Sequence, residues 1–251
     1  MVQLIELLNY TDNLLEVERF RDYCPNGLQV EGRDQLTKIV SGVTASQALL
    51  ERAVAARADA ILVHHGYFWK GEDPCITGIK YRRLRCLLEN QISLIGYHLP
   101  LDAHPVYGNN AQLAGRLGLS IEGRFGGDTP AIGMYGRLPQ ATPIADFVAH
   151  TEAVLGQTSL HIAAGLEIIQ SVAWCSGAAQ SYIEKAVSLG VDAYLTGEVS
   201  EQTVHIARES GIHFIAAGHH ATERYGVQAL GEHLSQQFDI EHIYIDIPNP
   251  V

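Results

Sequence analysis

The chain has 251 residues, with 28 acidic and 17 basic side chains and a formal net charge of −11. Apolar types make up 47% of it, enough to bury one large core or two small ones, which excludes an intrinsically disordered protein. The acidic balance argues against a surface that coats nucleic acid, although a local basic pocket could still contact it. No segment reaches the roughly 18 consecutive apolar residues of a membrane span, and no secretory signal is recognisable at the N-terminus. The four cysteines are scattered, so we expect a cytoplasmic protein with reduced thiols.

Strand-like and helix-like segments alternate along the first half of the chain. Strands are expected at Lys38–Val43, Ala60–Val63 and Ile92–Tyr97, and helices near Ile79–Glu89 and Asn110–Leu117. A further helix is expected soon after the first strand. Strands separated by helices predict parallel βαβ units and a layered α/β fold.

The segment from about residue 120 to 143 has a different composition. It is rich in glycine and proline, at Gly123, Gly126, Gly127, Pro130, Gly133, Gly136, Pro139 and Pro143. Such a composition is typical of a connection, so we predict a linker here, between a first domain at 1–125 and a second at 126–251. In the second half we expect strands at Ile168–Cys175, Asp192–Leu195, Ile212–Ala216 and His242–Ile247. The helices expected among them are Ile144–Leu155, Ser181–Leu189, Glu201–Glu209 and Thr222–Gln237.

The two halves resemble each other. Ser46–Val54 aligns with Ala179–Val187 at a constant offset of 133 residues, and Asp59 then falls on Asp192. Further along, Leu94–His98 resembles Ile215–His219. Matches that follow one another in the same order indicate an internal duplication, hence two similar α/β domains.

Residues that can bind metal ions gather at the ends of three predicted strands. They are His64 and His65 after the second strand, His98 and Asp102 after the third, and His219 and Glu223 in the second half. In open α/β sheets, ligands bind at the carboxyl ends of strands. The adjacent pair His64-His65 suggests two metals or a bent strand end, because neighbouring side chains of a strand point in opposite directions.

We therefore predict a site with two divalent metal ions. Its ligands are His64, His65, Asp102, His219 and Glu223. Mixed imidazole and carboxylate ligation suits zinc, iron, manganese, cobalt or nickel without selecting among them. By symmetry His98 could be a further ligand, or it could orient Asp102 or the substrate. For the other histidines considered, we favour ordinary hydrogen-bonding roles: His104, His205, His220, His233 and His242.

Several motifs together resemble the YbgI proteins of the Nif-three-like family. They are Cys24–Gly32, Val63–Gly71, Tyr97–Pro105, Thr196–Gln202, Gly218–Arg224 and Ile245–Pro250. The resemblance extends almost from end to end and weakens only at about 120–168. It implies two similar α/β domains that face each other across a metal-binding cleft, and a homo-oligomeric ring of six subunits. The family's metal ligands correspond to the five residues named above.

The resemblance also implies an activity, because many members are labelled GTP cyclohydrolase 1 type 2 homologs. The label implies a metal-dependent hydrolase that opens the imidazole ring of a guanine nucleotide. We hypothesise that Glu223 bridges the two metals and that His98 transfers a proton or orients the substrate; these two are the predicted catalytic residues. The alternatives are a non-catalytic metal-binding ring with a regulatory or scaffold role, and metal-dependent processing of nucleic acid.

Four other features have two interpretations each. Tyr67–Trp69 could stack on a flat base, with Lys70 near a phosphate, or could pack an interface, which we favour for Phe68. The basic cluster Lys80, Arg82, Arg83 and Arg85 is either a solvated helix face or a rim that attracts phosphate. Pro25-Asn26-Gly27 is a turn signature, and Asn26 or Gln29 could contact substrate. Glu198 could approach the metal site, as could its neighbour Glu201.

Overall fold

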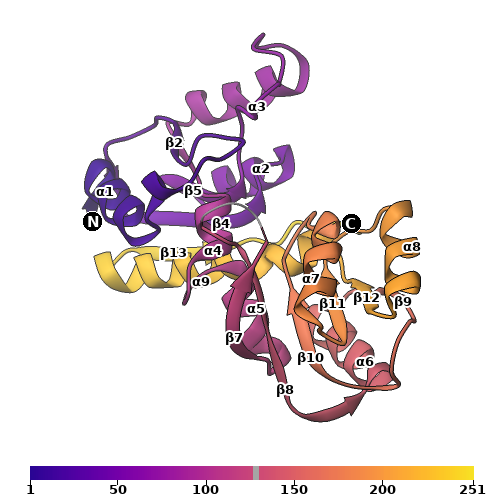
Figure 1. The fold of residues 1–251 in the computed structure, drawn as a ribbon. Helices are drawn as coiled ribbons and strands as arrows, with labels where there is room; N and C mark the ends of the chain where they lie inside the picture. The colour runs from indigo at the N-terminus through magenta and orange to yellow at the C-terminus, as the bar shows by residue number, and fades with distance from the viewer. Residues whose placement is uncertain (127–129) are drawn as a thin grey trace. The chain divides into compact units, whose positions relative to one another are not determined.

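The computed structural model describes residues 1–126 and 130–251, in which strands and helices alternate (Figure 1). The chain divides into two compact units. Unit 1 comprises Met1–Leu101 and Gly226–Ile247, and unit 2 comprises Asp102–Tyr225 and Pro248–Val251. Each unit has its own sheet covered by helices, which confirms the predicted α/β class. Within the described residues, no helix has both the length and the apolar character needed to cross a membrane.

The sheet of unit 1 has five strands in the order β13-β4-β5-β6-β2. Their bounds are β13 (Glu241–Tyr244), β4 (Lys38–Thr44), β5 (Ala60–His65), β6 (Ser93–Gly96) and β2 (Gly27–Val30). The first four are parallel, and β2 is antiparallel to β6. A two-stranded sheet pairs β1 (Val2–Gln3) with β3 (Gln35–Leu36). The helical segments of this part of the chain are α1 (Leu4–Leu14), η1 (Val17–Arg19), α2 (Gln47–Ala55), α3 (Gly78–Glu89), α4 (Leu99–Ala103) and α9 (His219–Phe238).

Both faces of this sheet are buried, because successive strand residues enter different cores. In β5, Ala60 and Leu62 pack in the cluster that includes α1 and α9, whereas Ile61 and Val63 pack in the cluster that includes α2 and α3. Alternation with a period of two, combined with apolar residues at every position, is expected of a parallel strand covered on both sides.

The sheet of unit 2 has six strands in the order β7-β8-β10-β11-β12-β9. Their bounds are β7 (Ser120–Phe125), β8 (Gly133–Pro143), β10 (Ile168–Trp174), β11 (Ala193–Thr196), β12 (His213–Ala216) and β9 (Leu160–Ile162). The helical segments are α5 (Asn109–Leu117), α6 (Ile144–Leu155), η2 (Gln180–Tyr182), α7 (Ile183–Leu189) and α8 (Glu201–Ser210). Here too, neighbouring strand residues such as Tyr194 and Leu195 belong to different cores.

This division differs from the predicted boundary near residues 125 and 126. The predicted linker at about 120–143 contains β7 and β8, which pair with each other and, through β8, with β10. Its glycines permit close packing: a Cβ at Gly136 would lie 1.7 Å from the carbonyl oxygen of Ser120. Gly127 lies outside the described residues. The chain passes between the units within α4 and again within α9, so that its C-terminal part adds β13 to the first sheet.

The topology repeats in the two units, as a duplication predicts. β4-β5-β6-β2 and β10-β11-β12-β9 share strand order, with three parallel strands followed by an antiparallel one. The Oδ2 atom of Asp59 accepts hydrogen bonds from the backbone amides of Thr37 and Lys38, at 2.7 and 3.0 Å. The same atom of Asp192, 133 residues later, accepts them from residues 170 and 171 at 2.9 and 2.8 Å.

The pairing of the third strand corrects one detail of the predicted alignment. Ala60 pairs with Ser93 in unit 1, and its counterpart Ala193 pairs with His213 in unit 2, so the third strands differ by 120 residues rather than 121. The helices that follow begin at Leu99 and His219. His98 is therefore not the counterpart of His219, and the symmetry argument for His98 as a ligand fails by one residue.

Candidate metal centre

Three imidazoles cluster at the strand ends of unit 1. His64 and His65 are the last two residues of β5, and His98 follows β6 by two residues. One ring nitrogen of each lies within 4.8 Å of the others. The ring centroids of His64 and His65 are 4.6 Å apart, and those of His64 and His98 are 5.1 Å apart. The adjacent histidines thus direct nitrogen atoms into one cluster at the end of the strand.

Each of these imidazoles uses its Nδ1 atom in a contact with the protein. Nδ1 of His64 lies 2.9 Å from the carbonyl oxygen of Tyr97, and Nδ1 of His98 lies 2.7 Å from Oδ1 of Asp22. Nδ1 of His65 lies 3.2 Å from Oγ1 of Thr44. Because carbonyl and carboxylate oxygens only accept, Nδ1 of His64 and His98 carries the hydrogen and Nε2 holds the lone pair that a metal ion needs.

Asp22 organises the position of His98, and the sequence patterns did not reveal it. Its side chain is only 3% exposed and also accepts from Nδ2 of Asn26 and the amide of Leu99, both at 2.9 Å. Oδ1 of Asn26 accepts from the amide of His98 at 2.7 Å. Burial raises the pKa of Asp22, but the hydrogen bond and charge of His98, with the Asn26 and Leu99 donors, lower it further, so the carboxyl stays ionised.

Gln29 likewise forms hydrogen bonds to the backbone through both atoms of its amide. Its Oε1 atom accepts from the amide of Tyr67 at 2.7 Å, and its Nε2 atom donates to the carbonyl of Pro25 at 2.8 Å. A Cβ at Gly66 or Gly96 would come within 3 Å of this amide. Both strand ends therefore need glycine where Gln29 passes. The side chains of Asn26 and Gln29 therefore form hydrogen bonds to the backbone just after β6 and β5. Sequence patterns do not reveal such contacts, because they join residues far apart in the chain.

The aromatic segment after the histidines divides between core and site. Tyr67 is 6% exposed, packs in the core beside α2 and α3, and donates its hydroxyl to the carbonyl of Ala45 at 2.8 Å. Trp69 instead meets His98 edge-on, with ring centroids 5.0 Å apart. Phe68 is 37% exposed. Of the three aromatics, Trp69 is the one in contact with the imidazole cluster.

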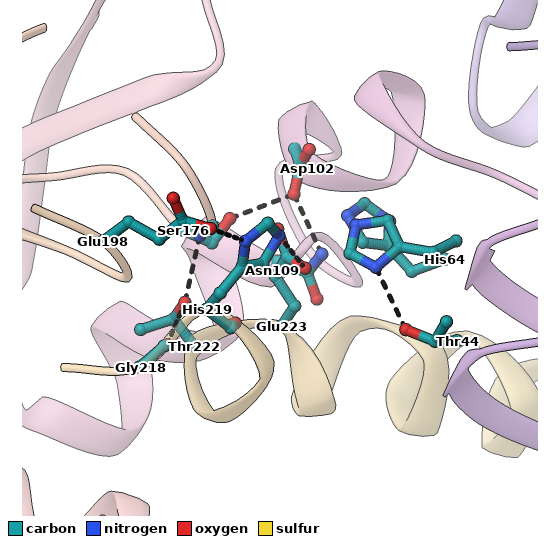
Figure 2. Close-up of polar contacts among 12 residues, drawn as sticks. Thr44, His64, Asp102, Asn109, Ser176, Glu198, Gly218, His219, Thr222 and Glu223 are labelled. Carbon is teal, nitrogen blue, oxygen red and sulfur yellow. Dashed lines mark hydrogen bonds and ion pairs between the residues drawn. The ribbon is translucent and has the colours of Figure 1, made fainter. Parts of the chain in front are cut away.

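In unit 2, a second group of donors surrounds the first turn of α9 (Figure 2). His219 and Glu223 are four residues apart and hence on one face of the helix, with Nε2 of His219 3.2 Å from Oε2 of Glu223. Asp102 is 5% exposed, and its Oδ1 atom accepts from Nδ2 of Asn109 at 2.9 Å and from Oγ of Ser176 at 3.0 Å. Asn109 and Ser176 were not predicted, because they lie on other elements of the unit.

His219 repeats the arrangement of the unit 1 imidazoles. Its Nδ1 atom lies 2.7 Å from Oε1 of Glu198, the residue predicted to approach the site. Burial lowers the pKa of His219, but the hydrogen bonds and charges of Glu223 and Glu198 outweigh it and raise the pKa to about 9. The pair of carboxylates thus stabilises positive charge at this imidazole, whether it comes from a proton or from a metal ion.

Gly177 brings backbone close to these donors. Its φ angle is +68°, and a Cβ there would lie 2.1 Å from Oε1 of Glu223 and 3.2 Å from Nε2 of His219. Its amide donates to Oγ1 of Thr222 at 3.0 Å. Only glycine fits both the left-handed backbone and the approach to the carboxylate.

Other histidines have partners that suit the structural roles predicted for them. Nε2 of His233 contacts the hydroxyl of Tyr10, and Nε2 of His242 contacts Oγ of Ser41, both at 2.7 Å. Nδ1 of His104 accepts from the amide of Tyr107 at 2.9 Å.

The donors within each unit are of the types that bind a divalent transition metal. They are imidazoles and carboxylates whose orientation is set by further hydrogen bonds, an arrangement that metal sites share. A duplicated α/β core with such groups at its strand ends defines a class of protein that can bind metal ions.

Comparison with known proteins identifies the family. The chain belongs to the Duf34/NIF3 (NGG1p interacting factor 3) family, whose profile matches residues 2–250. A Pseudomonas aeruginosa protein named GTP cyclohydrolase 1 type 2 homolog is 60% identical over 250 residues, covering 99% of both chains. A solved structure described as protein ybgI of unknown function has a TM-score of 0.97 and 52% identity, and covers 100% of both chains. A solved structure from Thermus thermophilus has a TM-score of 0.90 and 33% sequence identity, and the match again covers 100% of both chains. The predicted resemblance is confirmed.

Proposed function

We propose that the protein is a dinuclear metal-dependent hydrolase, similar to a GTP cyclohydrolase 1 type 2, that acts on a nucleotide or a related ring. His64, His65, Asp102, His219 and Glu223 bind two divalent ions of zinc, iron, manganese, cobalt or nickel. The observation that carries the proposal is the common use of Nδ1 in the four imidazoles His64, His65, His98 and His219. A protein contact at Nδ1 fixes the orientation of the ring, as the hydrogen bonds around metal-binding histidines do.

The residues around these donors have distinct tasks. Asp22 fixes the ring of His98, whose Nε2 atom accepts and returns a proton during hydrolysis. Glu198 orients His219, while Asn109 and Ser176 hold one oxygen of Asp102. Glu223 serves both as ligand and as a fixed negative charge beside the reaction. When bound, divalent ions supply Lewis acidity, which acidifies water and offsets the negative charge that develops in hydrolysis.

We further propose that the protein works in the cytoplasm as a homo-oligomer, a ring of six subunits. The ring is what the resemblance to the family implies, and the family profile matches residues 2–250 of this chain. Sedimentation equilibrium should give six times the mass of one chain. A monomer or dimer at micromolar concentration would contradict the ring.

The main experiment combines elemental analysis with a panel of nucleotides. Wild type is compared with Glu223→Gln and with Glu209→Gln, a matched control at an exposed residue near the end of α8. We expect turnover of at least one guanine nucleotide by wild type and Glu209→Gln, and loss of about 10²-fold or more in Glu223→Gln. A metal-free active protein would overturn the proposal. Bound metal without turnover of any nucleotide would favour the non-catalytic ring.

A further inference from the structure

A cavity of about 360 Å³ lies in unit 1 next to the first turns of α3. Tyr67, Thr77, Ile79, Lys80 and Arg83 are among the residues that line it. Its volume is within the range of small-molecule sites in proteins. None of these residues belongs to the proposed metal-binding set, so the cavity needs an explanation of its own.

Arg83 is the unusual member of the lining. Its Nε atom is buried without a hydrogen-bond partner, and in the part of the chain that the structure describes its guanidinium forms no ion pair. The cation lies over the ring of Tyr67, 5.9 Å from its centroid. A buried N–H donor without an acceptor is unfavourable, and an anion in the cavity would supply the acceptor that Nε of Arg83 lacks.

The other charges of the lining are already matched. Nζ of Lys80 donates to the carbonyl of Asp73 at 2.8 Å and lies 3.4 Å from Oε2 of Glu72. The Asp73 carboxylate accepts from the amide of Cys75 at 2.9 Å. Glu72 and Asp73 thus have partners nearby in the sequence, on their own loop and on α3, which leaves Arg83 as the cation that a ligand would meet.

Exposed apolar side chains accompany the cavity. Ile79, which lines it, is 58% exposed; Ile76, close by in the sequence, is 55% exposed, and Phe68, which lies under Nζ of the lining residue Lys80 at 5.6 Å, is 37% exposed. Phe68 also has a φ angle of +65°, a backbone conformation that costs free energy for an aromatic residue and tends to occur at binding sites. Exposed apolar side chains near one cation with a buried, unpaired Nε atom suit a ligand with an apolar body and one anionic group.

We infer that this cavity binds a small organic anion, a carboxylate or phosphate monoester with an apolar body, whose anionic group pairs with Arg83. The apolar part then covers Ile79 and the ring of Tyr67. This site is separate in its residues from the proposed catalytic machinery, so the failure of either proposal leaves the other intact.

The test uses the full-length protein and 4-methylbenzoate as the probe. Isoleucine methyl NMR spectra report on Ile79 at the cavity and on Ile121, an exposed residue of β7, as a remote reference. We expect the Ile79 signal to shift on titration and the Ile121 signal to stay unchanged. Inorganic phosphate and uncharged 4-methylbenzyl alcohol should each bind at least about tenfold more weakly, because each lacks one of the two contacts.

Two neighbouring arginines provide the matched variants. Arg83→Gln should weaken binding of 4-methylbenzoate about tenfold or more, whereas Arg82→Gln, at an exposed residue of α3, should bind like wild type. Should Arg83→Gln fail to fold, Thr77→Tyr would fill the cavity from an exposed position and abolish binding with Arg83 intact. Equal binding by the two arginine variants, equal binding of the alcohol and the acid, or an unshifted Ile79 signal would each overturn the inference.

Discussion

The two units build similar scaffolds and place different chemistry on them. Both contain three parallel strands with an antiparallel fourth, and an aspartate at the start of the second strand that ties down the first. In unit 1 the strand ends provide imidazoles, His64, His65 and His98, drawn from two neighbouring strands. In unit 2, His219 and Glu223 come from one helical turn. A duplicated scaffold thus preserves the backbone hydrogen bonds that maintain the fold, while the residues at strand ends are free to diverge.

The largest effect should come from Gly177, whose backbone touches the carboxylate of unit 2. Gly177→Ala adds both left-handed strain and a Cβ 2.1 Å from Oε1 of Glu223, so we expect a loss of about 3 kcal/mol in unfolding free energy and weaker metal binding. Gly190→Ala is the matched control, with φ of +69° and open space around its Cβ. It should cost only about 1 kcal/mol. Urea unfolding of both variants measures the difference, and equal losses would show that the carboxylate simply moves aside.

The next comparison concerns the carboxylates that hold imidazoles in each unit. Asp22 is buried with several donors, whereas the side chain of Glu198 is 33% exposed. In Asp22→Asn, the new side-chain amide can place its NH2 group towards Nδ1 of His98. Nδ1 then accepts a hydrogen bond, which favours the tautomer with the hydrogen on Nε2. We expect turnover to fall about 10²-fold in Asp22→Asn, because His98 transfers the proton in the proposed reaction, and metal affinity to fall about tenfold in Glu198→Gln, because His219 is a proposed ligand. Competition with a chelator measures affinity, and nitrogen NMR of the His98 ring reports its tautomer.

The control for this pair is Asp34→Asn, which removes the same charge from an exposed residue of unit 1. It should leave both measurements unchanged. An unaltered His98 tautomer in Asp22→Asn would contradict the orienting role of Asp22.

The shared aspartates should give the two units the same response to pH. Burial raises the pKa of Asp59 and of Asp192, but backbone and hydroxyl donors with a nearby arginine charge lower each below its usual value. A lowered pKa stabilises the fold above the unfolded-state value of about 3.9, and this stabilisation is lost as the pH falls below that value and through the lower pKa of the folded state. Asp59→Asn and Asp192→Asn should each lose about 1–2 kcal/mol at pH 7. The difference from wild type in thermal unfolding should shrink towards pH 3; a constant difference would contradict the ionised role.

The smallest effect should come from the ion pair between Arg33 and Asp59. Arg33 forms an ion pair with Asp59 at 2.9 Å, but the arginine side chain is 43% exposed. Because water screens such a pair, Arg33→Gln should lower the unfolding free energy by about 0.5 kcal/mol. This loss should be smaller still in high salt. Denaturant unfolding at low and high salt tests this. A loss as large as that of Asp59→Asn would mean that the ion pair, rather than the amide hydrogen bonds, holds the aspartate.

Local sequence patterns were enough to predict most of the strands and helices and several residues of the candidate site. The βαβ alternation follows from apolar runs bounded by turns, and the proximity of His219 and Glu223 follows from helical spacing, which depends only on residues four apart. The motifs around the histidines were also specific enough to predict the family, which the profile match confirms.

Long-range pairing decided the rest. A glycine-rich segment that looks like a linker becomes β7 and β8 because partner strands accept its backbone, and β13 joins the first sheet from the opposite end of the chain. The one-residue shift between His98 and His219 depends on strand register. Two alignments of apolar residues that differ by one position look almost equally good in the sequence, and only the hydrogen bonds between the strands select one of them. Asp22 could not be linked to His98 beforehand, since 76 residues separate them and only folding brings the carboxylate to the imidazole.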